Sequence, residues 1–153
     1  MLDRYPDDPR LHFMKGSILA GKQRFIEGHA ALSRAIEIAP DFVLARYQLG
    51  FFELTSGEAE RALSTWGPLL KLPLENYLRN FVEGLTHLIR DEFADAIAKM
   101  RAGIERNHEN MPMNRDIELL IAECERMREN GNDDAQSATS FILGQLTTDS
   151  TRH

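Results

Sequence analysis

The sequence predicts an all-α protein, built as an array of three helix–turn–helix pairs followed by a capping helix. The first observation is a repeat of 34 residues, because Gly16, Gly50 and Gly84 share one column (16 + 34 = 50 and 50 + 34 = 84). The second is that other columns at this spacing keep one kind of side chain: aromatic Phe13/Tyr47/Phe81, small Gly28/Ala62/Ala96 and large apolar Leu32/Trp66/Met100. The third is the apolar spacing of i, i+3 and i+4 within each segment, which is typical of amphipathic helices.

Composition narrows the function classes. The 153 residues are 42% hydrophobic, which is enough for a core, and carry a net charge of -6, which argues against non-specific nucleic-acid binding. No run of about 18 apolar residues occurs, so no membrane span is expected. With Cys124 as the single cysteine, an intramolecular disulfide is excluded. This scarcity of cysteine is typical of a reducing compartment and predicts a cytoplasmic protein.

The first pair is expected from about Pro9 to Ala20 and from about Phe25 to Ile38, with Asp8 as N-cap and Gly21 giving the turn its freedom. Residues 1–8 resemble the exit turn of a preceding repeat, either as a remnant or because the chain was cut from a longer array. The sequence does not decide between these two origins.

The second pair is expected from about Phe42 to Thr55, capped by Asp41, and from about Glu58 to Leu70. Gly67 and Pro68 lie inside its second helix and predict a kink or an early end there, because proline removes a backbone hydrogen bond. The third pair is expected from about Glu75 to Ile89 and from about Glu92 to Asn107. The repeats therefore span about 9–42, 43–76 and 77–110.

A single helix at 114–128 follows the third pair and completes a domain of residues 9–130. Its apolar stripe is Ile117, Leu120, Ile121, Cys124 and Met127. A lone final helix fits a capping role, since the last pair of an array exposes apolar surface. Residues 131–153 are expected to form a short amphipathic segment and a disordered tail.

The segment ARYQLG, followed by Gly57, Ala62 and Trp66, resembles a tetratricopeptide repeat. Two other segments are similar: FMKG, followed by Phe25, Gly28, Leu32, Ala35 and Pro40, and VEGL, followed by Phe93, Ala96, Met100 and Gly103. The resemblance covers about residues 9–110. It implies a right-handed α-α superhelix whose first helices line a concave face that holds peptides or other proteins.

The resemblance also implies which residues line that groove: Phe13, Ser17, Leu44, Tyr47, Phe51, Leu54, Leu78, Phe81, Leu85 and Leu88. The family's charged clamp for a C-terminal carboxylate is absent, because apolar or small polar residues such as Phe13, Gln48 and Leu78 occupy its columns. An amphipathic helix or an extended apolar peptide is the expected ligand. The alternative is that the aromatic column is core packing within each pair.

Two further occupants of the groove stay open: the chain's own residues 138–146, and a second copy in a homodimer. Catalysis, a metal and a cofactor are not expected. Glu83, His87 and Asp91 have i, i+4, i+8 spacing that could hold a metal, but solvated charges of this kind are common on helices. Cys124 lies on the apolar stripe of the capping helix, where a buried thiol is expected.

The predicted function is therefore non-enzymatic protein binding, as a scaffold or adaptor. The alternative, also implied by the resemblance, is a small chaperone of the secretion or assembly type that holds a hydrophobic partner before release. The partner and its pathway are not encoded in any motif of the sequence.

Overall fold

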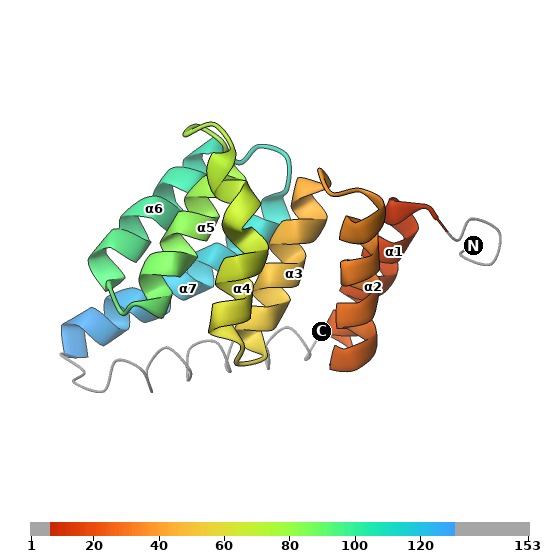
Figure 1. Cartoon of the computed structure of the whole chain (residues 1–153). Helices are drawn as coiled ribbons and strands as arrows, with labels where there is room; N and C mark the ends of the chain where they lie inside the picture. The colour runs from red at the N-terminus through yellow and green to blue at the C-terminus, as the bar shows by residue number, and fades with distance from the viewer. Residues whose placement is uncertain (1–6, 131–153) are drawn as a thin grey trace. The chain divides into compact units, whose positions relative to one another are not determined.

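The computed structural model describes residues 7–130, and every regular element in that range is a helix (Figure 1). The elements are α1 (Pro9–Gly21), α2 (Phe25–Ile38), α3 (Val43–Thr55), α4 (Ala59–Trp66), the 3-10 helix η1 (Gly67–Lys71), α5 (Tyr77–Ile89), α6 (Phe93–Arg106) and α7 (Met111–Asn130). The predicted all-α class is confirmed. The predictions for residues 1–6 and for the segment 138–146 fall outside the described residues.

The described chain divides into two compact units between Gly67 and Pro68, where the sequence predicts a kink or an early end of a helix. The first unit contains α1 to α4 and ends at Gly67, and the second begins at Pro68 and contains η1 and α5 to α7. The predicted early end is confirmed, because α4 stops at Trp66 and the chain continues as a 3-10 helix. Proline explains the stop, since it has no N–H for the helical hydrogen bond and its ring clashes with the preceding turn.

In each pair, the glycine column of the first helix lies against the large apolar column of the second helix. A methyl group at Gly16 would lie 2.6 Å from Cγ of Leu32, and one at Gly84 would lie 2.6 Å from Cγ of Met100. Trp66 lies against Gly50 in the same way. From the repeat we expected the small columns to let helices of adjacent pairs approach each other. This expectation is wrong, because the small residue instead lets the two helices of one pair approach.

The first unit joins its two pairs through α2 and α3. Leu32 of α2 and Leu49 and Phe52 of α3 are buried in one apolar cluster, on which Phe13 and Ile36 also pack. The rings of Phe25 and Phe52 lie 5.5 Å apart. This cluster shows how a second helix covers the first helix of the following pair.

In the second unit, α5 packs on α6, and α6 packs on α7. The expected capping helix begins earlier than predicted, at Met111, and ends at Asn130. Its predicted apolar stripe, which includes Ile117, Leu120 and Cys124, is buried. Asn107 and Asn114 fix the α6–α7 connection, since the side-chain amide of Asn107 donates to Oδ1 of Asn114 at 2.8 Å.

The three turns between the helices of a pair have one backbone geometry at a spacing of 34 residues. Gln23, Gly57 and Asp91 have φ of 60°, 86° and 60°, and the next residue in each turn donates its N–H to a carbonyl five positions back at 2.9 Å. This is the Schellman arrangement at a helix end. Gly21 was expected to supply the turn's freedom, but it is the last residue of α1, and Gln23 takes the left-handed conformation.

The helix starts are only partly as predicted. Asp8 caps α1, because its carboxylate accepts from the backbone N–H of Arg10 at 2.9 Å, and this hydrogen bond lowers the pKa of Asp8. Asp41 does not cap α3, whose N-cap is Phe42 without a side-chain hydrogen bond. Asn76 caps α5, with its side chain accepting from Leu78 N at 2.9 Å.

Candidate protein-binding surface

The aromatic column of the predicted groove lies inside the helix pairs. Tyr47 is 3% exposed and its ring stacks on Trp66, with centroids 6.4 Å apart. Phe81 is fully buried and lies against Gly103 of α6. Both side chains are therefore packing residues within their own pair, which is the alternative that the sequence left open for this column.

The other predicted groove residues divide by accessibility. Leu54, Leu78, Leu85 and Leu88 are buried. Phe13, Leu44 and Phe51 are half-buried, and Ser17 is exposed. All four accessible residues belong to the first unit. Six of the ten predicted groove residues are thus buried.

Exposed apolar side chains lie instead outside this set, on several elements, and two of them, Met14 and Ile18, share one face of α1. Met14 and Ile18 are each 56% exposed and lie one turn apart on the helix, with the half-buried Leu11 one turn before Met14. Among the described residues of α1, those buried are Gly16 and Leu19. We call Leu11, Met14 and Ile18 the α1 stripe. Sequence reasoning missed it, although its i, i+3, i+7 spacing was visible.

The repeat supplies a direct comparison for this stripe. Leu11 and Ile18 occupy the columns of Ala45 and Phe52 on α3 (11 + 34 = 45 and 18 + 34 = 52). In the second pair these two residues are buried, and Phe52 is covered by α2. The column of Ile18 therefore packs against a helix in the second pair and is exposed in the first.

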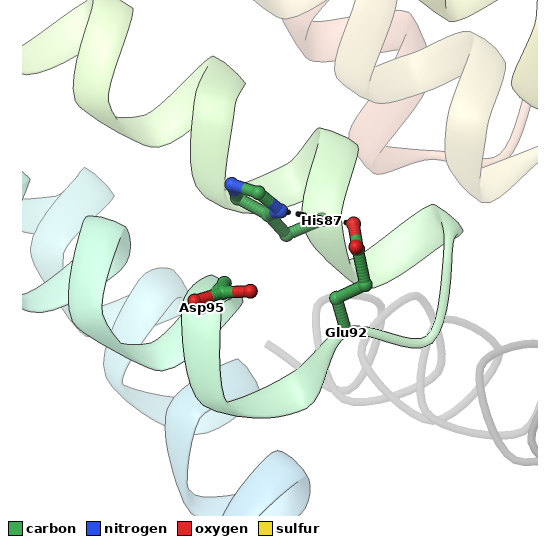
Figure 2. A group of neighbouring side chains, drawn as sticks. All are labelled: His87, Glu92 and Asp95. Carbon is green, nitrogen blue, oxygen red and sulfur yellow. Dashed lines mark hydrogen bonds and ion pairs between the residues drawn. The ribbon is translucent and has the colours of Figure 1, made fainter.

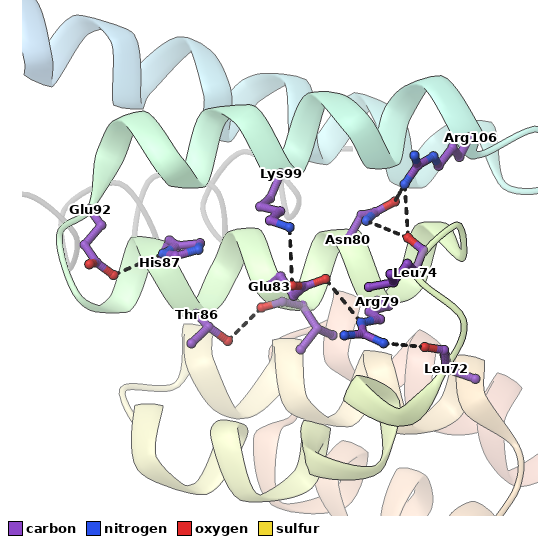
Figure 3. Close-up of polar contacts among 11 residues, drawn as sticks. Leu72, Leu74, Arg79, Asn80, Glu83, Thr86, His87, Glu92, Lys99 and Arg106 are labelled. Atoms are coloured by element: carbon purple, nitrogen blue, oxygen red, sulfur yellow. Dashed lines mark hydrogen bonds and ion pairs between the residues drawn. The ribbon is translucent and has the colours of Figure 1, made fainter.

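In the third pair the equivalent columns are polar. Arg79 and Thr86 replace Ala45 and Phe52, and Glu83 replaces Leu49 (45 + 34 = 79, 52 + 34 = 86 and 49 + 34 = 83). These side chains bond within the second unit, since Arg79 donates to Leu72 O at 2.7 Å and Thr86 donates to Val82 O at 2.7 Å (Figure 3). An apolar docking face is thus a property of α1 and α3 and is not shared by α5.

Polar side chains of the second unit also hold the chain that leads into α5. Carbonyl Leu74 O accepts from Nη1 of Arg106 at 3.0 Å and from Nδ2 of Asn80 at 3.3 Å (Figure 3). Asn80 is buried, and its own oxygen accepts from Arg106. These bonds satisfy the backbone of the turn before α5, so we assign them a structural role.

A group of possible metal ligands lies at the α5–α6 turn, with different members from the sequence expectation. His87 is joined by Glu92 and Asp95, and their ligand atoms lie within 4.8 Å of one another (Figure 2). His87 Nδ1 and Glu92 Oε1 are 3.0 Å apart, which is an ordinary hydrogen bond or ion pair. Both carboxylates are exposed. The geometry is that of a surface ion-pair cluster beside a helix end, with a weak resemblance to a metal site.

A second polar group is buried in the first unit. Glu53 is 2% exposed, and its carboxylate accepts from Thr65 Oγ1 at 2.6 Å and faces His29 Nε2 at 2.9 Å and Arg61 Nε at 3.1 Å. Ser33 Oγ lies 3.4 Å from His29 Nδ1. The order Ser–His–Glu resembles that of a catalytic triad, but here the carboxylate is shared with Arg61 and Thr65. Ser33 also lies within α2, where the backbone N–H groups bond internally. The group ties α2, α3 and α4 together.

The surroundings of Cys124 disfavour a role as a nucleophile. Burial, with a smaller contribution from the neighbouring carboxylates of Glu123 and Glu125, raises the pKa of its thiol to about 12. Since the thiolate is the reactive form, the sulfur is inert at neutral pH.

No protein-family model matches the sequence, and no curated protein matches it significantly. Within residues 7–130, no helix has both the length and the apolar character that crossing a membrane requires. The α1 stripe is therefore the feature from which a function can be argued.

Proposed function

We propose that this chain is a non-enzymatic protein-binding module, formed as a right-handed tetratricopeptide-like array of three helix pairs with a capping helix. The single observation that carries the proposal is the 56% exposure of Ile18 on α1, whose counterpart on α3, Phe52, is buried against α2. Apolar side chains gathered on one face of a helix normally mark an interaction site.

The accessible part of the predicted groove belongs to the same proposal as a second contact area. Phe13, Leu44 and Phe51 are half-buried, and a partner seated over them would remove further apolar surface from water. Tyr47 is buried and its ring stacks on that of Phe51, with centroids 6.1 Å apart, so it would support this surface without touching a ligand.

The partner in this proposal is a protein or peptide, met in a reducing, cytoplasmic setting. A net charge of -6 disfavours nucleic acid as the ligand. A scaffold should remain in a stable complex, whereas a chaperone of the secretion or assembly type should protect its partner from aggregation and then release it. The lifetime of a captured complex separates these two roles.

The test is affinity capture from the native cell's lysate with three forms of the full chain: wild type, Ile18→Glu and Ile26→Glu. Ile26 is 88% exposed on α2 and is a control for the added charge. The proposal expects partners that wild type and Ile26→Glu capture and that Ile18→Glu loses while keeping its helical circular dichroism. Identical captures by all three forms would contradict a role for the α1 stripe, and a parallel Phe51→Glu form would then examine the groove side.

A further inference from the structure

We infer that the α1 stripe is a docking site for one amphipathic helix of a partner, with an apolar stripe like that of α2. This inference rests on the proposed protein-binding function and names the kind of partner. It is argued from the repeat, because the residue equivalent to Ile18 in the second pair, Phe52, is covered by α2.

The first step is the contact made by Phe52, the counterpart of Ile18. Phe52 is 7% exposed and lies against Phe25 of α2, with ring centroids 5.5 Å apart, and against Leu32. What covers this column is the side of a helix and not an extended segment. A helix presented to Ile18 would therefore find a face of the same type as the one that α3 offers to α2.

The second step is the pattern that the covering helix must carry. The residues of α2 that meet or flank Phe52 and its cluster are Phe25, His29, Leu32 and Ile36. Their spacing of 4, 3 and 4 residues is a heptad-like stripe, the usual pattern of one helix lying along another. A partner helix with large apolar side chains at i, i+7 and i+11 would reproduce this contact.

The third step concerns a difference between the two faces. Lys15 stands in the column of Leu49 (15 + 34 = 49) and is exposed. The methylene stem of a lysine can cover apolar surface while its ammonium group reaches water. Lys15 therefore leaves the docking face usable and favours a partner helix with a carboxylate beside its stripe.

The probe for this inference is a fluorescent peptide of residues 24–39, the α2 sequence itself. A lactam bridge between Ala30→Glu and Arg34→Lys would hold it helical, because both positions are exposed in α2 and four residues apart. The intact protein's own α2 keeps the α3 face covered, since an intramolecular helix has a high effective concentration. The face left for the peptide is therefore that of α1.

Fluorescence anisotropy with the full chain should show saturable binding by wild type and by Ile26→Glu. Ile18→Glu in the protein, or Phe25→Glu in the peptide, should raise the dissociation constant by at least about tenfold, which corresponds to about 1.4 kcal/mol. No binding at the highest soluble concentration, or equal binding by Ile18→Glu, would overturn the inference. Lysate partners that still depend on Ile18 in that case would leave the proposed function standing and show that the ligand is not a helix of this type.

Discussion

Trp66 lies directly against Gly50, and its indole Nε1 donates a hydrogen bond to the carbonyl oxygen of Tyr47 at 3.1 Å. The rigid ring thus occupies the space that a side chain at residue 50 would need. Its one polar atom, Nε1, is hydrogen-bonded to α3, the helix that contains Gly50. This contact closes the second helix pair.

Gly50→Ala should therefore destabilise the protein. The new methyl group would overlap the indole ring, and we expect the free energy of unfolding to fall by about 2–3 kcal/mol, as in other overpacked cores. Gly21→Ala is the matched control, because a methyl group there meets nothing within 4 Å and alanine favours the helix, so stability should rise by about 0.5–1 kcal/mol. Urea denaturation followed by circular dichroism measures both changes, and equal values for the two variants would contradict the contact.

The left-handed turn residues predict opposite effects for opposite substitutions. Gln23→Gly should stabilise the chain by about 0.5–1 kcal/mol, because a side chain costs about 1 kcal/mol in the left-handed conformation. Gly57→Ala should destabilise it by a similar amount, since its φ is 86° and the space around it is open, so the effect comes from the backbone alone. Thermal denaturation of the two variants beside wild type would reveal the signs, and a loss of stability in Gln23→Gly would refute the assignment.

Removing the buried carboxylate of Glu53 should weaken the first unit. Glu53→Gln keeps the shape but loses the charge that faces Arg61 and His29, and we expect a loss of about 1–3 kcal/mol. Glu27→Gln serves as the control, because its pair with Arg24 is exposed on both sides and should change stability by less than about 0.5 kcal/mol. Chemical denaturation of both variants compares the two sites. Equal losses would mean that burial of Glu53 does not strengthen its pairing.

Cys124 should resist thiol reagents as long as the protein is folded. With its pKa raised to about 12, the thiolate fraction at about pH 8 is on the order of one in ten thousand. Labelling by a chromogenic disulfide should be at least about 100-fold slower in the native protein than in concentrated guanidinium chloride, since burial also blocks access. Rapid labelling of the native form would mean that α7 opens readily.

Asp116 should make stability depend on pH. Burial raises its pKa in the folded protein, although Arg115 partly opposes the shift. A raised folded pKa means that the folded state binds the proton more tightly, so this group's contribution is most favourable below the unfolded pKa and is lost as pH rises through the folded pKa. Asp116→Asn should therefore be more stable than wild type at about pH 7, and the gap should close at about pH 3. A stability difference between the variant and wild type that widens at acidic pH would contradict a raised pKa of Asp116 in the folded protein.

The repeat period predicted the helices well because the helix-forming pattern is local. The bounds of α1, α2 and α3 follow from apolar spacing and turn residues, and the stop at Trp66 follows from Pro68. The period did not reveal which columns face each other, since Gly50 could in principle have met either its own pair or a neighbouring one.

The candidate surface was harder to predict for a related reason. An apolar column such as Tyr47 or Phe81 has the same appearance in sequence whether it is covered by its own pair or lines a groove. The spacing of the α1 stripe is visible in the sequence, but its exposure is understood only by comparison of Ile18 with Phe52, which α2 covers. Burial of that kind depends on a neighbour, and the residue's own pattern does not contain it.

The three Schellman turns also provide equivalent positions for spectroscopic labels, between which distances along the chain can be measured. Gln23, Gly57 and Asp91 differ in residue type but follow one backbone path, so spectroscopic labels at these positions would have equivalent backbone surroundings. Labels at 23 and 57 would report a separation inside the first unit, whereas labels at 57 and 91 would report across the boundary at Gly67 and Pro68. The first distance should be narrowly distributed, because both labels lie in one compact unit, and the second would measure the separation of two residues on either side of Pro68.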